Sequence, residues 1–101
     1  MTVRYSTNWM GPVNLKWYTD RGLDPMEDRW AGGRIDVRGD DLGPYGDELS
    51  LPIMREDSYA LFSDWLKTFE TDSMWTLDQL VELYERANPK IVWAKDVFGE
   101  Q

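Results

Sequence analysis

The sequence contains no cysteine and no histidine. Without cysteine the chain can form neither a disulfide framework nor a thiolate nucleophile or metal ligand. Without histidine it lacks the commonest general base and the commonest neutral metal ligand. These absences exclude Ser-His-Asp and Cys-His catalysis, whereas chemistry based on paired carboxylates, as in glycosidases, remains possible. A chain of 101 residues leaves little room for the substrate cleft of such an enzyme, so we expect a protein that is not an enzyme and needs no cofactor.

Long apolar runs are missing as well. No segment approaches the ~20 apolar residues that a membrane-spanning helix requires. The first residues show no basic segment followed by an apolar one, so no secretory signal is expected, and Thr2 excludes N-myristoylation. Neither a Walker A sequence nor a GxGxxG motif occurs, since Gly32-Gly33 stands alone. These features predict a cytoplasmic location.

Basic residues are few, with 11 Lys and Arg against 19 Asp and Glu, which gives a net charge of −8. Direct binding to nucleic acid is disfavoured because it depends on cations that neutralise phosphates. An anionic membrane repels an acidic surface for the same reason. The charge instead suits a basic partner protein, and nucleic-acid-binding proteins are the commonest of these. The simpler interpretation is that the charge only keeps a small protein soluble.

Apolar residues are nevertheless sufficient for a core. The chain is 42% hydrophobic and contains six Trp, five Tyr and three Phe, which bury a large area per residue. This composition, without a linker or an internal repeat, predicts a single domain over residues 1–101.

Five short segments show patterns typical of strands. Apolar and polar residues alternate in most of them, and Gly or Pro breaks lie between them. The segments are Val3–Trp9, Leu15–Thr19, Arg34–Arg38, Leu49–Ile53 and Ile91–Trp93. We expect the first two to pair with each other. Leu49, Leu51 and Ile53 should share one face, and Pro52 places this strand at an edge of the sheet because proline has no N–H to donate.

Helical spacing marks two further segments. The apolar stripe of the first consists of Tyr59, Phe62, Leu66 and Phe69, with Asp57 or Ser58 expected as its N-cap. In the second, Thr76 and Gln79 have the spacing of a capping box. Its apolar stripe consists of Leu77, Leu80, Val81 and Tyr84, and Asn88-Pro89 ends it.

Neither helix can bury its stripe alone, whereas an antiparallel sheet with one apolar face can cover both. We therefore predict a two-layer α+β domain, with an antiparallel sheet of four to five strands and two helices packed on one face. The tail 95–101 is expected to fray unless Val97 and Phe98 dock against the domain.

An acidic loop is the first candidate for a functional site. Asp40, Asp41, Asp47 and Glu48 bracket a Gly-rich segment, and carboxylates are ligands that Ca²⁺ accepts. Their spacing does not match the EF-hand pattern, so we favour a turn that is rich in Asp and Gly for backbone reasons, with no metal. Tyr45, between Pro44 and Gly46, is the aromatic side chain best placed to anchor a partner.

A second acidic group lies on the expected helix after Thr76. Asp78, Glu82 and Glu85 stand at i, i+4 and i+7 and so share one helix face. Together with Asp64, Glu70 and the acidic loop they could form one continuous negative surface that imitates a phosphate backbone. The alternative is that both helices have ordinary solvated faces, which the interruptions by Lys67 and Arg86 favour.

Several stretches of the chain together resemble a family of small accessory proteins of tailed bacteriophages, to which no activity is assigned. These stretches are Asn8–Pro12, Ala31–Asp41, Leu51–Arg55, Phe69–Asp72 and Trp75–Ile91. The chain departs from its relatives in a shorter segment over residues 22–30. The resemblance implies a phage setting, in which small acidic proteins often bind and disable host machinery, as anti-CRISPR, anti-restriction and polymerase-modulating proteins do.

These observations lead to one functional hypothesis and one alternative. The hypothesis is a phage-encoded inhibitor that binds a basic host defence or nucleic-acid-handling protein in the host cytoplasm, with no direct nucleic-acid or membrane contact. The residues expected to bind the partner are Asp40, Asp41, Tyr45, Asp47, Glu48, Asp78, Glu82 and Glu85. The alternative is a structural or assembly protein of the phage particle that self-associates as a homo-oligomer.

Overall fold

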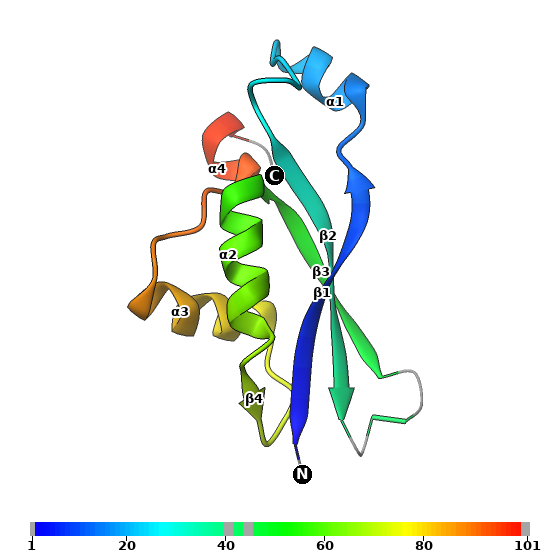
Figure 1. Cartoon of the computed structure of the whole chain (residues 1–101), viewed down its shortest axis with the longest axis vertical. Helices are drawn as coiled ribbons and strands as arrows, with labels where there is room; N and C mark the ends of the chain where they lie inside the picture. Colours follow the sequence, from blue (N-terminus) through cyan, green and yellow to red (C-terminus); the bar gives the residue numbers. More distant parts are fainter. Residues whose placement is uncertain (1, 40–41, 44–45, 100–101) are drawn as a thin grey trace.

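The computed structural model describes residues 2–39, 42–43 and 46–99, with the side chains of residues 9–12 outside that description. The chain forms a twisted sheet with helices packed against it (Figure 1). In chain order the elements are β1 (Val3–Pro12), α1 (Leu15–Asp20), β2 (Trp30–Gly39), β3 (Asp47–Arg55), α2 (Glu56–Leu66), β4 (Glu70–Thr71), α3 (Leu77–Ala87) and α4 (Ala94–Phe98).

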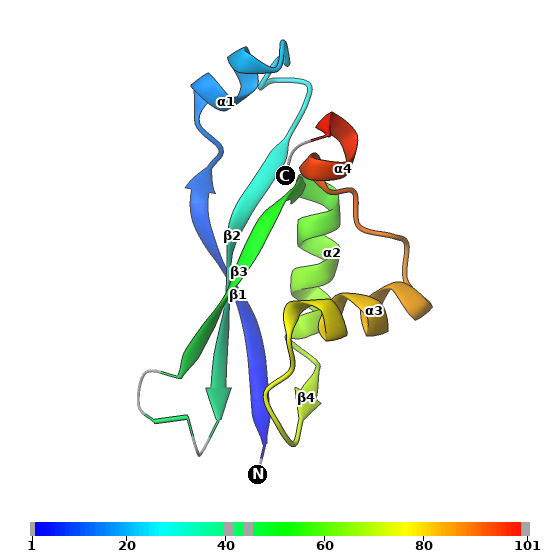
Figure 2. The ribbon, with the colours of Figure 1, turned by 180° about the vertical axis from the view of Figure 1, so that it is seen from behind.

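The four strands form one antiparallel sheet in the order β3-β2-β1-β4. Helices α2 and α3 lie on the same side of this sheet in both views (Figures 1 and 2). Ile35 and Val37 of β2 point toward them and are fully buried, together with Phe62, Leu66 and Leu80 of the helices. The predicted α+β class, with an antiparallel sheet and helices on one face, is therefore confirmed.

The predicted strand at Leu15–Thr19 is wrong, because this segment forms helix α1. The Asn14 side chain caps the helix by accepting the backbone N–H of Trp17 at 2.9 Å. The predicted pairing of the first two strands is wrong for the same reason. Strand β1 pairs instead with β2, with Val3 opposite Gly39, and residues 13–29 form the connection between them.

Strand β3 is an edge strand, as Pro52 predicted. Its register against β2 shifts between Ala31 and Gly33, so that the chain bulges at this point. Leu49 and Leu51 contact the main core, but Ile53 contacts a second cluster and Met54 takes its place in the core. The prediction that Leu49, Leu51 and Ile53 share a face is therefore wrong at Ile53.

Helix α2 begins earlier than predicted, at Glu56, and its N-cap is Arg55, which makes no side-chain capping bond. Asp57 and Ser58 thus lie inside the first turn and are not caps. The helix ends at Leu66, yet Phe69 still stacks on Trp65 with a ring separation of 4.6 Å. For α3 the predicted capping box of Thr76 and Gln79 is confirmed.

The C-terminal segment differs from the prediction. Residues 91–93 form a single bridge between Trp93 and Met54, where a strand was predicted, and α4 follows directly. Phe98 docks against Trp30 and Trp17, with ring separations of 5.4 and 5.8 Å, while Val97 stays exposed. Over the part of the chain described here, no helix combines the length and apolar character needed to cross a membrane.

Candidate partner-binding surface

The negative charge is unevenly distributed between the two halves of the fold. Residues 1–55, which form α1 and the three long strands, contain nine acidic and seven basic residues. Residues 56–101, which contain α2, α3 and α4, hold ten acidic and four basic residues. We call residues 56–101 the helical half. It carries −6 of the net charge of −8.

The three predicted acidic residues of α3 have different surroundings. Asp78 lies exposed in the first turn, where a carboxylate is favoured by the helix dipole. Glu82 is exposed and pairs with Arg86 at 2.9 Å. Glu85 is half-buried and accepts the backbone N–H of Ile91 at 2.9 Å, so it ties down the chain after the helix. Asp78 and Glu82 are thus the exposed carboxylates of this group, and Glu82 is shared with Arg86.

Beside these carboxylates α3 carries a shallow hollow of about 180 Å³. Trp75, Gln79, Glu82, Leu83 and Arg86 line it. We refer to these residues and Asp78 as the α3 surface. Trp75 and Leu83 are half-buried and give the hollow an aromatic and apolar wall, while charged groups border it. An apolar centre with a polar rim is the usual anatomy of a protein interface.

Glu85 also acts on the neighbouring tyrosine. Burial raises the pKa of the Tyr84 phenol above its ordinary value of 10.0, and the Glu85 carboxylate raises it further. Both effects disfavour the tyrosinate, so Tyr84 stays neutral at physiological pH.

Helix α2 exposes an apolar residue that was not predicted from the sequence. Asp57, Leu61 and Asp64 stand at i, i+4 and i+7, and 53% of Leu61 is accessible. Asp78, Glu82 and Glu85 of α3 show the same spacing, so the shared helix face of Asp57, Leu61 and Asp64 could also have been predicted from the sequence. A leucine between two carboxylates is a second place at which the helical half combines apolar contact with negative charge.

Three residues of the acidic loop, Asp40, Asp41 and Tyr45, lie outside the described residues. Asp47 and Glu48 begin β3, and Glu48 pairs with Arg34 at 3.4 Å. Arg34 alternates along β2 with the buried Ile35, so this ion pair lies on the face of the sheet opposite the helices.

The expected continuous surface therefore does not form among the described residues. Glu48 and the acidic residues of α3 lie on opposite sides of the sheet, since α3 packs against the face that Ile35 and Val37 line. Local spacing correctly grouped Asp78 with Glu82, but it could not show which side of the sheet each group occupies.

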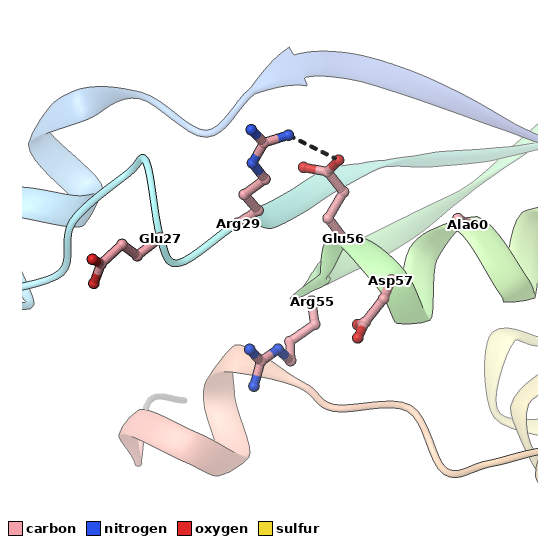
Figure 3. Close-up of a pocket in the computed structure, with 6 residues that line it drawn as sticks. All are labelled: Glu27, Arg29, Arg55, Glu56, Asp57 and Ala60. Carbon is pink, nitrogen blue, oxygen red and sulfur yellow. Dashed lines mark ion pairs between the residues drawn. The ribbon is translucent and has the colours of Figure 1, made fainter.

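A larger depression, of about 330 Å³, lies where the connection before β2 meets the start of α2 (Figure 3). It is lined by Glu27, Arg29, Arg55, Glu56, Asp57 and Ala60. Arg29 and Glu56 point toward one another, with a nitrogen-to-oxygen distance of 4.0 Å, and their side chains are 63% and 46% exposed. The depression is therefore open to water and of mixed charge.

A metal site is not evident at this depression or elsewhere in the described part of the chain, which holds no group of three or more Asp or Glu residues arranged to bind an ion.

Comparisons of the chain with protein-family models, with curated proteins and with solved structures found no match. Any function assigned to the chain accordingly rests on its own residues.

Proposed function

We propose that the chain is a non-enzymatic accessory protein of a tailed bacteriophage that binds and inhibits a basic host protein. The target class is a defence or nucleic-acid-handling protein in the host cytoplasm, as for anti-CRISPR and anti-restriction proteins. The observation that carries the proposal is the concentration of −6 of the net charge on the helical half, where the α3 surface adds an aromatic hollow.

Charge and hollow have separate roles in this proposal. The negative field of the helical half attracts a basic surface over several ångströms and raises the association rate. The α3 surface then forms the close contact, with Trp75 as its anchor, because large aromatic residues contribute most to the stability of interfaces. Lysine or arginine side chains of the target would contact Asp78 and Glu82, the latter in competition with Arg86.

A pull-down from host lysate followed by titration of the captured protein tests the proposal. The test variant is Asp78→Asn/Glu82→Gln, which removes two charges from the α3 surface. The matched control is Asp20→Asn/Glu27→Gln, which removes two charges from α1 and the connection before β2, outside the helical half. We expect the test variant to bind roughly tenfold more weakly and with a smaller salt dependence, and the control to bind almost as the unchanged chain does.

Equal losses in the two variants would contradict a localised binding surface. An unchanged affinity in both would contradict charge-directed binding altogether. If no host protein is captured, the second candidate function gains weight, namely a self-associating protein of phage assembly. The observation that favours this second candidate is an open edge of the sheet at β1.

A further inference from the structure

Strand β1 has a long pairing partner on one side only. On that side it pairs with β2 from Val3 to Trp9 and, after a register shift, at Pro12. On the other side β4 pairs only with Val3 and Arg4. Among the described residues beyond Arg4, no turn, loop or cap hydrogen bond uses the backbone of β1. In Figures 1 and 2 the distal half of β1 likewise has no neighbouring strand on its outer side.

The opposite edge of the sheet, at β3, is protected in three ways. Pro52 removes a donor, Asp47 and Glu48 place charges at one end, and the 92–93 segment covers the other end. In that cover Val92 accepts the backbone N–H of Arg55 at 3.0 Å, and Trp93 bridges to Met54. Charges, proline and covering segments are the usual means of preventing edge-to-edge pairing. Their presence at β3 makes their scarcity at β1 informative.

No charged residue occurs in the eleven residues from Tyr5 to Leu15, in a chain that is 30% charged. The nearest charged side chains on the open face are paired within the chain. Arg4 pairs with Glu70 at 3.0 Å, and Arg34 pairs with Asp36 at 3.2 Å. Pairing at this edge therefore brings no unpaired charge of residues 5–9 against the other copy, although each chain carries a net charge of −8 elsewhere.

We propose that two copies of the chain pair through the open edges of β1, antiparallel, over residues 5–9. A two-fold axis at Thr7 then places Ser6 of each copy opposite Asn8 of the other. The sheet becomes continuous in the order β3-β2-β1-β1-β2-β3. A second copy fits this edge because an antiparallel pair of identical strands is self-complementary under a two-fold axis. Positions 10 and 11 of each copy face positions 4 and 3 of the other, where β4 is already paired, so β4 limits the pairing to residues 5–9 at both ends.

The two-fold symmetry also affects partner binding. The axis of such a pair stands perpendicular to the sheet, so both helical halves lie on the same side of the joined sheet. A dimer would present two α3 surfaces to one side, and a target with two basic sites would bind it with avidity. The pairing itself does not depend on the proposed function, because it follows from the edge alone.

The oligomeric state tests this proposal with a matched pair of variants. Ser6 and Ser50 are both exposed serines on the open face of the sheet, Ser6 on β1 and Ser50 on β3. In Ser6→Lys each copy contributes one positive charge to the proposed β1–β1 junction. In Ser50→Lys each copy gains the same charge at the protected β3 edge instead. We expect light scattering over a concentration series to show a dimer whose dissociation constant rises roughly threefold to tenfold in Ser6→Lys and stays unchanged in Ser50→Lys.

Hydrogen exchange at low and high protein concentration provides a second, site-specific measurement. Amides that alternate along residues 5–9 and point away from β2 should exchange quickly in the dilute protein and become protected in the dimer. A chain that remains monomeric at all concentrations overturns the proposal and leaves the edge to a strand from another protein. A dimer that Ser6→Lys does not weaken, or that leaves these amides unprotected, overturns it as well.

Discussion

The phenolic hydroxyl of Tyr5 accepts the backbone N–H of Trp75 at 2.9 Å, across 70 positions of the sequence. The same hydroxyl hydrogen-bonds with the Thr71 side chain at 2.8 Å and donates to the carbonyl of Ser73 at 3.2 Å. One side chain of β1 thus holds the whole turn that leads from β4 into α3. Because Trp75 lines the hollow, this contact also positions the α3 surface.

Replacing Tyr5 with Phe should therefore lower the stability of the domain. The change leaves the Trp75 N–H without its acceptor, which costs about 1–3 kcal/mol, while the Thr71 hydroxyl keeps its hydrogen bond to the Ser73 carbonyl. Urea unfolding measures the loss. Tyr84→Phe is the matched control, because Tyr84 is equally buried and no described residue hydrogen-bonds with its hydroxyl. Equal losses in the two variants would show that the Tyr5 hydroxyl contributes nothing of its own.

Tyr84 should make the protein less stable at alkaline pH. Its pKa in the folded state is raised above 10.0 by burial and by Glu85, so the unfolded chain releases this proton at lower pH than the folded one. Stability is therefore fully retained below the unfolded pKa and declines as the pH rises toward the folded pKa. The urea midpoint should be measured from neutral pH to beyond the tyrosine pKa, and it should fall less steeply with pH in Tyr84→Phe than in the unchanged chain. The same pH dependence in both proteins would contradict a raised pKa of Tyr84.

The β2–β3 connection depends on glycine at position 46. Gly46 has a φ of +65°, and a Cβ there would lie 2.1 Å from the carbonyl oxygen of Val37. Gly43 also has a positive φ, of +80°, but nothing lies within 4 Å of its Cβ position. We expect Gly43→Ala to cost about 1–2 kcal/mol in unfolding free energy from backbone strain alone. Gly46→Ala should cost clearly more, since it adds a steric clash, and equal costs in thermal unfolding would refute the close approach.

Phe98 should be essential for the packing of α4. Its ring contacts Trp17 and Trp30, so Phe98→Ala removes a half-buried aromatic side chain at a cost of about 2 kcal/mol. Tryptophan fluorescence should shift toward the emission of exposed indole, because Trp17 and Trp30 become more accessible to solvent. The neighbouring Val97 is 54% exposed, and Val97→Ala is expected to stay within about 0.5 kcal/mol of the unchanged chain. A stable, unshifted Phe98→Ala variant would mean that the helix docks without this ring.

Local patterns in the sequence were enough for much of the fold. The strands at Val3–Trp9 and Arg34–Arg38, the capping box at Thr76 and the apolar stripe of α3 were predicted from short-range features, and each was confirmed. The predicted strand at Leu15–Thr19 is wrong because alternation over so few residues also fits a short helix capped by Asn14. The packing of α1 could not be predicted, because Phe98 reaches it from the far end of the chain.

For the candidate surface, the sequence by itself determined the acidic balance and the shared helix face of Asp78 and Glu82, because both depend only on composition and helical spacing. Only the tertiary structure decided that Glu85 turns to the Ile91 amide and that Glu48 lies on the other side of the sheet. It also decided which edge of the sheet stays open. These outcomes depend on strand order and on packing between distant segments, which no local pattern encodes.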